Sequence, residues 1–203
     1  MKHLRIAVLG SGKGSNFIAL HQAVVKRELP IDIVRVAGDV PDSGILTYAE
    51  SHRLPTYLIP SGMFRTRLDA QVETELASLL LRDGTECVVL AGYMRVIKAP
   101  LLNAFPGRIL NIHPSLLPDF KGLAAWKQAL DAQVSETGCT VHWVDDSLDG
   151  GPIIAQRKVP VLSEDTADTL HARIQIEEHR LLPDVLEQIA NGTISLPATM
   201  RSS

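Results

Sequence analysis

Residues 4–16 read Leu-Arg-Ile-Ala-Val-Leu-Gly-Ser-Gly-Lys-Gly-Ser-Asn, and this stretch indicates the class of fold. The aliphatic run 4–9 is typical of a short buried strand, and the glycines that follow it let the backbone turn sharply. A helical pattern then extends from about residue 17 to residue 29. A strand, a glycine loop and a helix in this order favour an α/β sheet, in which the N–H groups at the helix start can face an anion.

The alternation of strand-like and helical patterns continues along the chain. Further strand-like runs lie at residues 31–36, 56–59, 87–90, 109–112, 140–144 and 153–161. Helical spacing is found at 45–53, 68–80 and 166–190, with Pro183 as a predicted kink and Asn191-Gly192 as a stop. The last two strands flank a Gly-Gly-Pro turn, which suits antiparallel pairing. We therefore predict an α/β fold, a Rossmann-like mixed and mostly parallel sheet with helices on both faces.

The length and composition narrow the class of protein. The 203 residues, 45% of them apolar, suggest one domain over 1–203 with a loosely ordered tail from residue 193. A net charge of −3 argues against a nucleic-acid-binding protein, and the lack of a run of 18 apolar residues argues against a membrane span. The chain begins with a strand-like run rather than a signal peptide, and Cys87 and Cys139 lie in apolar runs that favour buried thiols. We expect a cytoplasmic protein that binds small molecules.

Two later stretches carry candidate catalytic residues. Positions 111–122 read Asn-Ile-His-Pro-Ser-Leu-Leu-Pro-Asp-Phe-Lys-Gly, and positions 148–152 read Leu-Asp-Gly-Gly-Pro. Strand alternation places Asn111 and His113 on one face, while their apolar neighbours pack on the other. Together with Asp149 they offer an amide, an imidazole and a carboxylate, which can stabilise a negative oxygen and move a proton without a metal. Taken alone, a histidine at a strand end is more often structural, and Asp-Gly is a turn dipeptide.

The glycine loop at 10–16 is a weak signal for any particular ligand. It lacks the third glycine of a dinucleotide fingerprint, and Lys13 is followed by Gly14 rather than by the Ser or Thr of a Walker A loop. Ser15 and Asn16 add side-chain donors or a helix N-cap. The loop favours a site for one phosphate monoester, and a tight turn without a ligand is the alternative. No cysteine and histidine spacing of a zinc site is found, so we expect no metal.

Six motifs in this order resemble those of the phosphoribosylglycinamide formyltransferases, a family of folate-dependent enzymes. They span positions 12–179, so the resemblance covers nearly the whole chain. The Asn-x-His with its Ser-Leu-Leu-Pro is specific for folate formyltransferases as a group. The motifs are Gly12-Lys-Gly-Ser-Asn16, Leu90-Ala-Gly-Tyr-Met-Arg-Val-Ile97, Asn111-Ile-His-Pro-Ser-Leu-Leu-Pro118, Gly138-Cys-Thr-Val-His142, Leu148-Asp-Gly-Gly-Pro152 and Gln175-Ile-Glu-Glu-His179.

The resemblance implies formyl transfer from the co-substrate 10-formyltetrahydrofolate to the amine of glycinamide ribonucleotide in purine biosynthesis. It implies a phosphate-binding half over about 1–105 and a catalytic, folate-binding half over about 106–195. The implied catalytic residues are Asn111, His113 and Asp149. Those implied to bind the ribonucleotide are Gly14, Ser15, Asn16, Gln175 and Glu178. Those implied to bind the folate are Arg67, Met94, Arg95, Val96, Ile97, Asn111, Asp145 and Asp149.

The chemistry expected of the trio is direct attack of an amine on the formyl carbon, which creates an oxyanion. Asn111 and His113 would donate hydrogen bonds to this oxygen, and Asp149 would keep His113 protonated. Ser115 lacks the G-x-S-x-G context of a nucleophile, so no covalent intermediate is expected. The Leu117–Pro118 bond in the same segment is a candidate for the cis form.

The sequence departs from the family pattern at two places. Residues 124–126 read Ala-Ala-Trp where the family often has histidines, and Lys13 replaces a common Asn. We expect His142 to be structural, and Tyr93 and Trp126 to be packing residues. The alternatives are a methionyl-tRNA formyltransferase, which usually has a further C-terminal domain, a formyltetrahydrofolate hydrolase, which usually has an N-terminal one, or a non-catalytic phosphate-sugar or folate-binding protein. The chain is expected to be a monomer or a homodimer.

Overall fold

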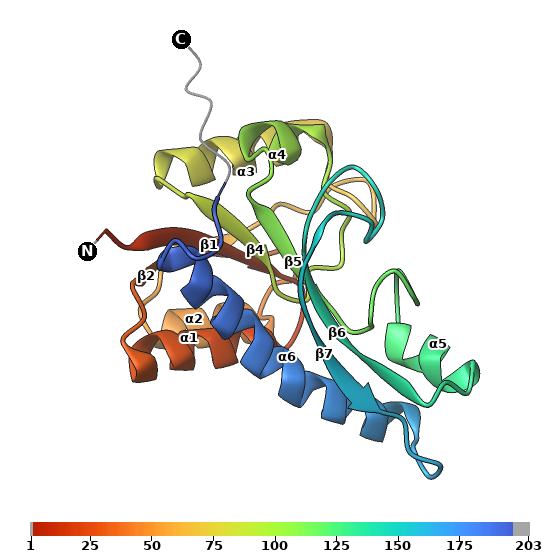
Figure 1. The fold of residues 1–203 in the computed structure, drawn as a ribbon. Helices are drawn as coiled ribbons and strands as arrows, with labels where there is room; N and C mark the ends of the chain where they lie inside the picture. The colour runs from red at the N-terminus through yellow and green to blue at the C-terminus, as the bar shows by residue number, and fades with distance from the viewer. Residues whose placement is uncertain (1, 197–203) are drawn as a thin grey trace.

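The structure is a computed structural model, and it describes residues 2–196 (Figure 1). Within these residues one seven-stranded sheet runs in the order β3-β2-β1-β4-β5-β6-β7. The strands are β1 (Leu4–Gly10), β2 (Ile31–Gly38), β3 (Thr56–Leu58), β4 (Cys87–Leu90), β5 (Ile109–His113), β6 (Glu136–Trp143) and β7 (Ile153–Pro160). The helices are α1 (Ser15–Arg27), α2 (Gly44–Ser51), α3 (Ala70–Arg82), α4 (Ala99–Ala104), α5 (Ala125–Asp131) and α6 (Ala167–Ala190).

The sheet is mixed, as predicted. Strands β1 to β5 pair in parallel, whereas β5–β6 and β6–β7 are antiparallel. From β1 the chain crosses to β2 on one side, and β4 lies on the other, so the strand order reverses at β1 and β4. Open α/β sheets bind ligands at such a switch point, beyond the carboxyl ends of the strands. Two hydrogen bonds join the segments that follow these strands, from Ser11 N to Gly92 O (3.1 Å) and from Met94 N to Ser11 Oγ (3.0 Å).

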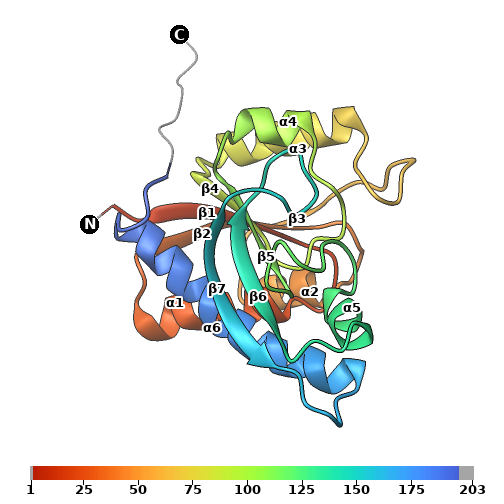
Figure 2. The ribbon, with the colours of Figure 1, turned by 45° about the vertical axis from the view of Figure 1, so that its right-hand side comes forward.

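Helices cover both faces of the sheet, which confirms the predicted fold class. Figures 1 and 2 show α3 and α4 on one side, and α1, α2 and α6 on the other. Each side has its own aliphatic core, and alternation along β5 divides its residues between the two cores. Ile109 packs on the side of α3 and α4, whereas Leu110 and Ile112 pack on the side of α6.

Two helices were not predicted, and several boundaries shift. Helices α4 and α5 have only six and seven residues, which is too short to give a clear helical period. Strand β6 begins at Glu136 rather than at residue 140, and α1 begins at Ser15 rather than at residue 17. Helix α6 continues through Pro183 and ends at Ala190, next to the predicted stop. In the tail, residues 193–196 form no helix or strand, and the expectation for 197–203 falls outside the described residues.

The prediction that both cysteines are buried thiols is confirmed. Cys87 and Cys139 are free and buried. Burial raises the pKa of each thiol to about 12, so neither is a reactive thiolate near neutral pH. Among the described residues, no helix has the length and apolar content that crossing a bilayer requires.

Candidate active site

His113 lies at the centre of the candidate site, at the carboxyl end of β5. Its Nδ1 is 3.5 Å from Asp149 Oδ2, and its Nε2–H donates to the carbonyl oxygen of Phe120 at 2.9 Å. Only 6% of the imidazole side chain is exposed. Both ring nitrogens therefore face oxygen atoms, one of a carboxylate and one of a backbone carbonyl.

Asp149 approaches His113 from the loop between β6 and β7. Its backbone is in the left-handed region with φ 45°, which is uncommon for a residue other than glycine. The carboxylate accepts a hydrogen bond from Gly122 N at 2.8 Å, so it also joins the loop after β5. Because Asp tolerates this conformation better than most residues, the loop can turn its carboxylate into the site.

His142 also belongs to this cluster, although we expected it from the sequence to be a structural residue. It pairs with Asn111 in the β5–β6 ladder, and Asn111 Nδ2 donates to His142 Nε2 at 3.2 Å. His142 Nδ1–H donates to Trp143 O at 2.8 Å, and His142 Nε2 is 3.8 Å from Asp149 Oδ1. Burial lowers the pKa of His142, although its hydrogen bond to Trp143 O and the nearby carboxylate of Asp149 oppose the shift. The only sequence signal for this residue was its place in the motif ending at His142.

The segment after His113 is fixed by neighbouring strands. Thr140 Oγ1 donates to Ser115 O at 2.6 Å and accepts from Leu117 N at 3.1 Å. Gln156 Nε2 donates to Leu117 O at 2.9 Å, and the Leu117–Pro118 peptide is cis, as expected. The hydroxyl of Ser115 donates to Asp119 O at 2.6 Å within the same segment. These contacts hold residues 115–119, the segment that leads to Phe120.

The glycine loop leads into α1 with Gly14 as the N-cap residue. Gly14 has φ 75° and lies against α2, since an added Cβ would be 2.8 Å from Ile45 Cα. None of the described side chains caps the helix, so of the two roles expected for Ser15 and Asn16, side-chain donor or N-cap, the N-cap role is wrong. The Asn16 side chain turns to α6 instead. The first-turn N–H groups of α1 therefore remain for a ligand, together with the positive end of the helix dipole.

Asn16 connects this loop to α6 in the interior. Its Nδ2 donates to Glu178 Oε2 at 3.2 Å, and its buried Oδ1 has no partner among the described residues. Burial raises the pKa of Glu178 to about 7, although the hydrogen bond from Asn16 opposes the shift. Half-buried Gln175 lies one turn earlier on the same helix. The structure thus joins two of the residues predicted to bind the ribonucleotide, Asn16 of α1 and Glu178 of α6.

The first turns of α6 also meet α5. Trp126 stacks on His171 with ring centroids 3.7 Å apart and an interplanar angle of 2°. The altered stretch 124–126 therefore packs against the helix face that continues to Gln175, and Trp126 is a packing residue, as predicted. Tyr93 is likewise buried.

Four of the residues predicted to bind folate, Met94 to Ile97, lie beyond the end of β4. Met94 and Val96 are exposed, Ile97 is buried, and Arg67 forms an isolated bridge with Val96. Arg95 is held by Asp39 through its Nε and by two backbone carbonyls through its Nη1. Asp145 accepts hydrogen bonds from the Ser147 hydroxyl at 2.5 Å and from Ser147 N at 2.9 Å, and both lower its pKa.

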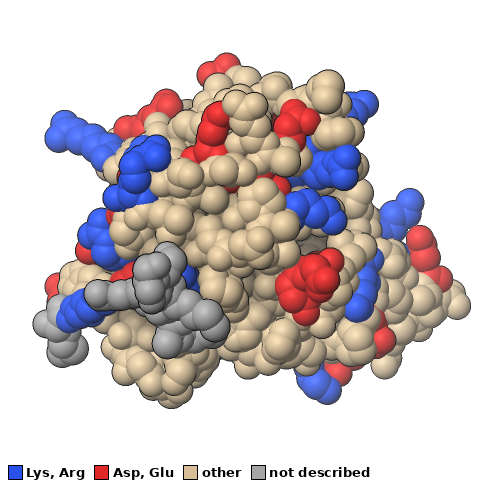
Figure 3. Space-filling model, turned by 90° about the horizontal axis from the view of Figure 1, so that it is seen from above, with Lys and Arg blue, Asp and Glu red and all other residues tan. Residues whose placement is uncertain are grey.

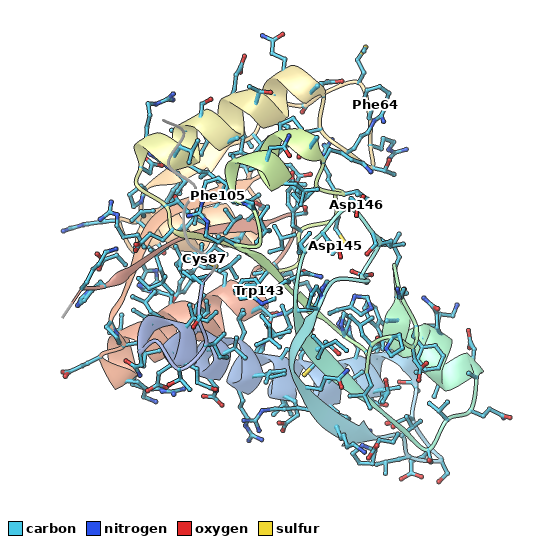
Figure 4. All side chains as sticks on the ribbon, turned by 45° about the horizontal axis from the view of Figure 1, so that its top comes forward. Phe64, Cys87, Phe105, Trp143, Asp145 and Asp146 are labelled. Atoms are coloured by element: carbon cyan, nitrogen blue, oxygen red, sulfur yellow. The ribbon has the colours of Figure 1, made fainter. Side chains whose placement is uncertain are left out.

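The predicted folate site has two candidate walls, residues 94–97 after β4 and residues 145–149 after β6. They lie on one side of the molecule. Figure 4 shows Phe64, Asp145 and Asp146 along the same side, although they come from the β3–α3 and β6–β7 connections. On the face seen in Figure 3, acidic and basic side chains are interspersed over a mostly uncharged surface. Asn111 lies next to the first wall, because Leu90 at the end of β4 pairs with it.

Residues 4–186 match the profile of the family described as formyl transferase. The chain belongs to this family. A curated Bacillus subtilis protein named phosphoribosylglycinamide formyltransferase is 37% identical to this formyl transferase over 91% of the chain and 94% of its own length. The trifunctional purine biosynthetic protein adenosine-3 of Bos taurus is 40% identical over 96% of the chain. The chain spans only about a fifth (19%) of that animal protein.

A solved structure supports the same assignment of this formyl transferase. The crystal structure of glycinamide ribonucleotide transformylase 1 from Symbiobacterium toebii superposes with a TM-score of 0.89 at 41% identity. The match covers 94% of this chain and 89% of the other. The family resemblance and the Rossmann-like fold inferred from the sequence are therefore confirmed.

Proposed function

We propose that the chain transfers the formyl group of 10-formyltetrahydrofolate to the amine of glycinamide ribonucleotide in purine biosynthesis. The observation that carries this proposal is the cluster at the end of β5, in which Asp149 lies beside His113 and Asn111 is joined to Asp149 through His142. The names of the Bacillus and Symbiobacterium relatives support the same reaction. The fold alone would not identify the reaction, because one fold serves many reactions.

The ribonucleotide phosphate would bind at the glycine loop. Gly14, Ser15 and Asn16 present the first N–H groups of α1, and helix N-termini favour anions. The unpartnered Asn16 Oδ1 could accept a hydrogen bond from the substrate, which would remove an uncompensated buried acceptor. Gln175 and Glu178 on α6 would complete this part of the site.

The folate co-substrate supplies a formyl group on a nitrogen that leaves. Negative charge develops on the carbonyl oxygen during acyl transfer, and placed N–H donors stabilise it by about 3–4 kcal/mol each. Asn111 has one amide hydrogen engaged by His142 and a second one available. A formyl oxygen in the place of the Phe120 carbonyl would accept the Nε2–H of His113. Asp149 would stabilise the imidazolium and thereby support proton transfer.

The residues beyond β4 suit a flat, partly apolar ligand. Met94 and Val96 expose 59% and 39% of their surfaces, and Phe64 on the neighbouring segment exposes 38%. Apolar and aromatic groups of this kind cover ring systems, while a few polar groups orient them. Arg67, Arg95, Ile97 and Asp145 would frame this part of the site together with Asn111 and Asp149.

A spectrophotometric assay tests the proposal directly. Purified protein with formylfolate and glycinamide ribonucleotide should produce the deformylated folate, followed by its absorbance, only when both substrates are present. His113→Ala should lower kcat by several orders of magnitude, because one acid–base group alone contributes about 10²–10⁴-fold and one oxyanion donor about 10²–10³-fold. No turnover with glycinamide ribonucleotide, or near-normal turnover of His113→Ala, would contradict the proposal.

The same assay separates the alternatives. Folate product formed without any amine would indicate a hydrolase, and formylation of methionyl-tRNA would indicate the tRNA enzyme. Calorimetric binding of both small molecules without turnover would indicate a binding protein. A cytoplasmic location, a monomer or homodimer, and a reaction without metal, nucleic acid or membrane are parts of the proposal that remain predictions.

A further inference from the structure

We infer that Arg95 is a positioning residue, which holds residues 60–69 against the end of β4 and so shapes the folate side of the site. This inference rests on the proposed function for the identity of the ligand. The structural part of the inference concerns only how residues 60–69 are held in place. The segment connects β3 to α3 and contains no helix or strand, and residues 63–67 are all exposed. A segment of this kind depends on a few contacts for its position.

The guanidinium of Arg95 supplies two of those contacts. Its Nη1 donates to the carbonyl oxygens of Phe64 at 2.6 Å and Arg67 at 3.1 Å. Both acceptors are backbone atoms, so the side chain binds the path of the segment rather than any one of its side chains. Hydrogen bonds from a charged donor are about twice as strong as neutral ones.

Asp39 fixes the guanidinium in this place. Its Oδ2 is 2.5 Å from Arg95 Nε, and the two side chains are only 12% and 6% exposed. Asp39 directly follows β2, and Arg95 lies in the connection after β4. The arginine therefore joins connections that leave the carboxyl ends of three parallel strands, β2, β3 and β4. All the hydrogen bonds of its guanidinium that are found within residues 2–196 go to Asp39 and to this segment.

The position of the segment matters for the apolar part of the site. Val96 N donates to Thr66 O at 2.9 Å, so the segment runs directly beside the exposed Met94 and Val96. Arg67 Cζ lies 4.1 Å above the ring of Phe64, so the two residues whose carbonyls Arg95 binds also contact each other. If Arg95 released the two carbonyls, Phe64 and Arg67 would lose their fixed place relative to Met94 and Val96.

Arg95→Lys is the primary test. Lysine keeps the positive charge near Asp39, but its compact ammonium cannot reproduce the planar fork that reaches three acceptors. We expect the KM for formylfolate to rise about tenfold or more, while kcat and the KM for glycinamide ribonucleotide change less than about twofold, as expected when binding of one substrate alone is weakened. A general loss of stability would not produce this difference between the two KM values.

Arg35→Lys is the matched control. Arg35 forms a two-pronged pair with Asp83 (2.8 and 3.0 Å) and donates to Thr56 O at 3.1 Å, so it also joins an aspartate to a backbone carbonyl. It lies on β2, and Asp83 follows α3 at the opposite end of the sheet from the site. Its variant should lose thermal stability to a similar degree without any change in either KM.

Limited trypsin digestion tests the inference without an activity assay. Arg65 and Arg67 are two cleavage sites inside the segment, so cleavage there reports how often the segment opens. We expect Arg95→Lys to be cut at these sites about tenfold faster than the wild type and Arg35→Lys, since cleavage follows the open population. Mass spectrometry of the fragments identifies the sites.

The outcomes are distinguishable. Equal cleavage rates and equal formylfolate KM values for Arg95→Lys and the wild type would overturn the inference, even if the enzyme is active. A wild-type protein without turnover would contradict the proposed function, and the digestion would still decide the role of Arg95. If Arg95→Lys does not fold, Asp39→Asn is the second test. Asparagine keeps the shape of the side chain that binds Arg95 and removes its charge. Faster cleavage at Arg65 and Arg67 in that variant would support the inference, and unchanged cleavage would refute it.

Discussion

The side chains of Asn111 and His142 face each other across the β5–β6 ladder, with Asn111 Nδ2 donating to His142 Nε2 at 3.2 Å. His142 can accept this bond only when Nε2 carries no proton. The donation of its Nδ1–H to Trp143 O and its lowered pKa both favour that form. The amide of Asn111 is thus oriented by a neighbour that touches no substrate in the proposed reaction.

We expect His142→Ala to lower kcat about 10- to 100-fold, because a misdirected oxyanion donor loses most of its effect. The KM for the ribonucleotide should change little. His142→Gln keeps an acceptor near Asn111 and should retain much of the activity. Steady-state kinetics of both variants provide the measurement, and equal losses in the two would indicate that His142 only fills space.

Asp149→Asn should separate the effect of the charge of Asp149 on catalysis from the effect of its shape. Asparagine tolerates φ 45° and can still accept from Gly122 N, so the loop should keep its conformation. Without the carboxylate beside His113, we expect kcat to fall at least about 100-fold with an unchanged Tm, in line with the loss of a charge that supports a general acid. A kcat within a few-fold of the wild type would argue against the role proposed for Asp149.

Glu178 should make the stability of the fold depend on pH. Its pKa is raised from 4.5 to about 7 in the folded state, so the folded protein binds more protons than the unfolded chain between these values. Stability should therefore fall as pH rises from about 4.5 to about 7, by roughly 3 kcal/mol for a shift of this size. Urea unfolding at pH 5 and pH 8 should show that the free energy of unfolding decreases less between these pH values in Glu178→Gln than in the wild type. Parallel pH dependence in both proteins would exclude Glu178 as the cause.

Gly14→Ala should damage both stability and ribonucleotide binding. A left-handed alanine costs about 1–2 kcal/mol, and its Cβ would also meet Ile45 Cα at 2.8 Å. Gly192→Ala is the control, since Gly192 has a similar φ of 76° and open space around its Cβ position. We expect a lower Tm for Gly14→Ala than for Gly192→Ala, and a higher KM for the ribonucleotide in Gly14→Ala alone. Equal Tm values would show that α2 moves aside.

The strands and long helices could be predicted because their signals are local. The aliphatic runs of β1 and β4 and the period of α6 are visible within windows of a few residues. The alternation along β5 is equally local, and it is sufficient to place Asn111 and His113 on a shared face. The six residues of α4 and the seven of α5 carry too little periodicity for the same reasoning.

The contacts that organise the site could not be predicted, because they join distant parts of the chain. Asp39 and Arg95 are 56 positions apart, and Asn16 and Glu178 are 162 positions apart. Nothing in the residues near Arg95 indicates that backbone carbonyls of another connection occupy its guanidinium. His142 lay within a recognised motif, yet its contact with Asn111 depends on the register of β5 against β6.

The bond between Asn16 and Glu178 has a consequence for dividing the molecule. The chain could be cut in the connection between β6 and β7 and expressed as two polypeptides, yet the first piece would lack the acceptor for Asn16 and the second would lack the glycine loop. Recovery of ribonucleotide binding after mixing would then require α6 to dock on α1. Such a split pair would act as a reporter of association between any two proteins fused to its pieces.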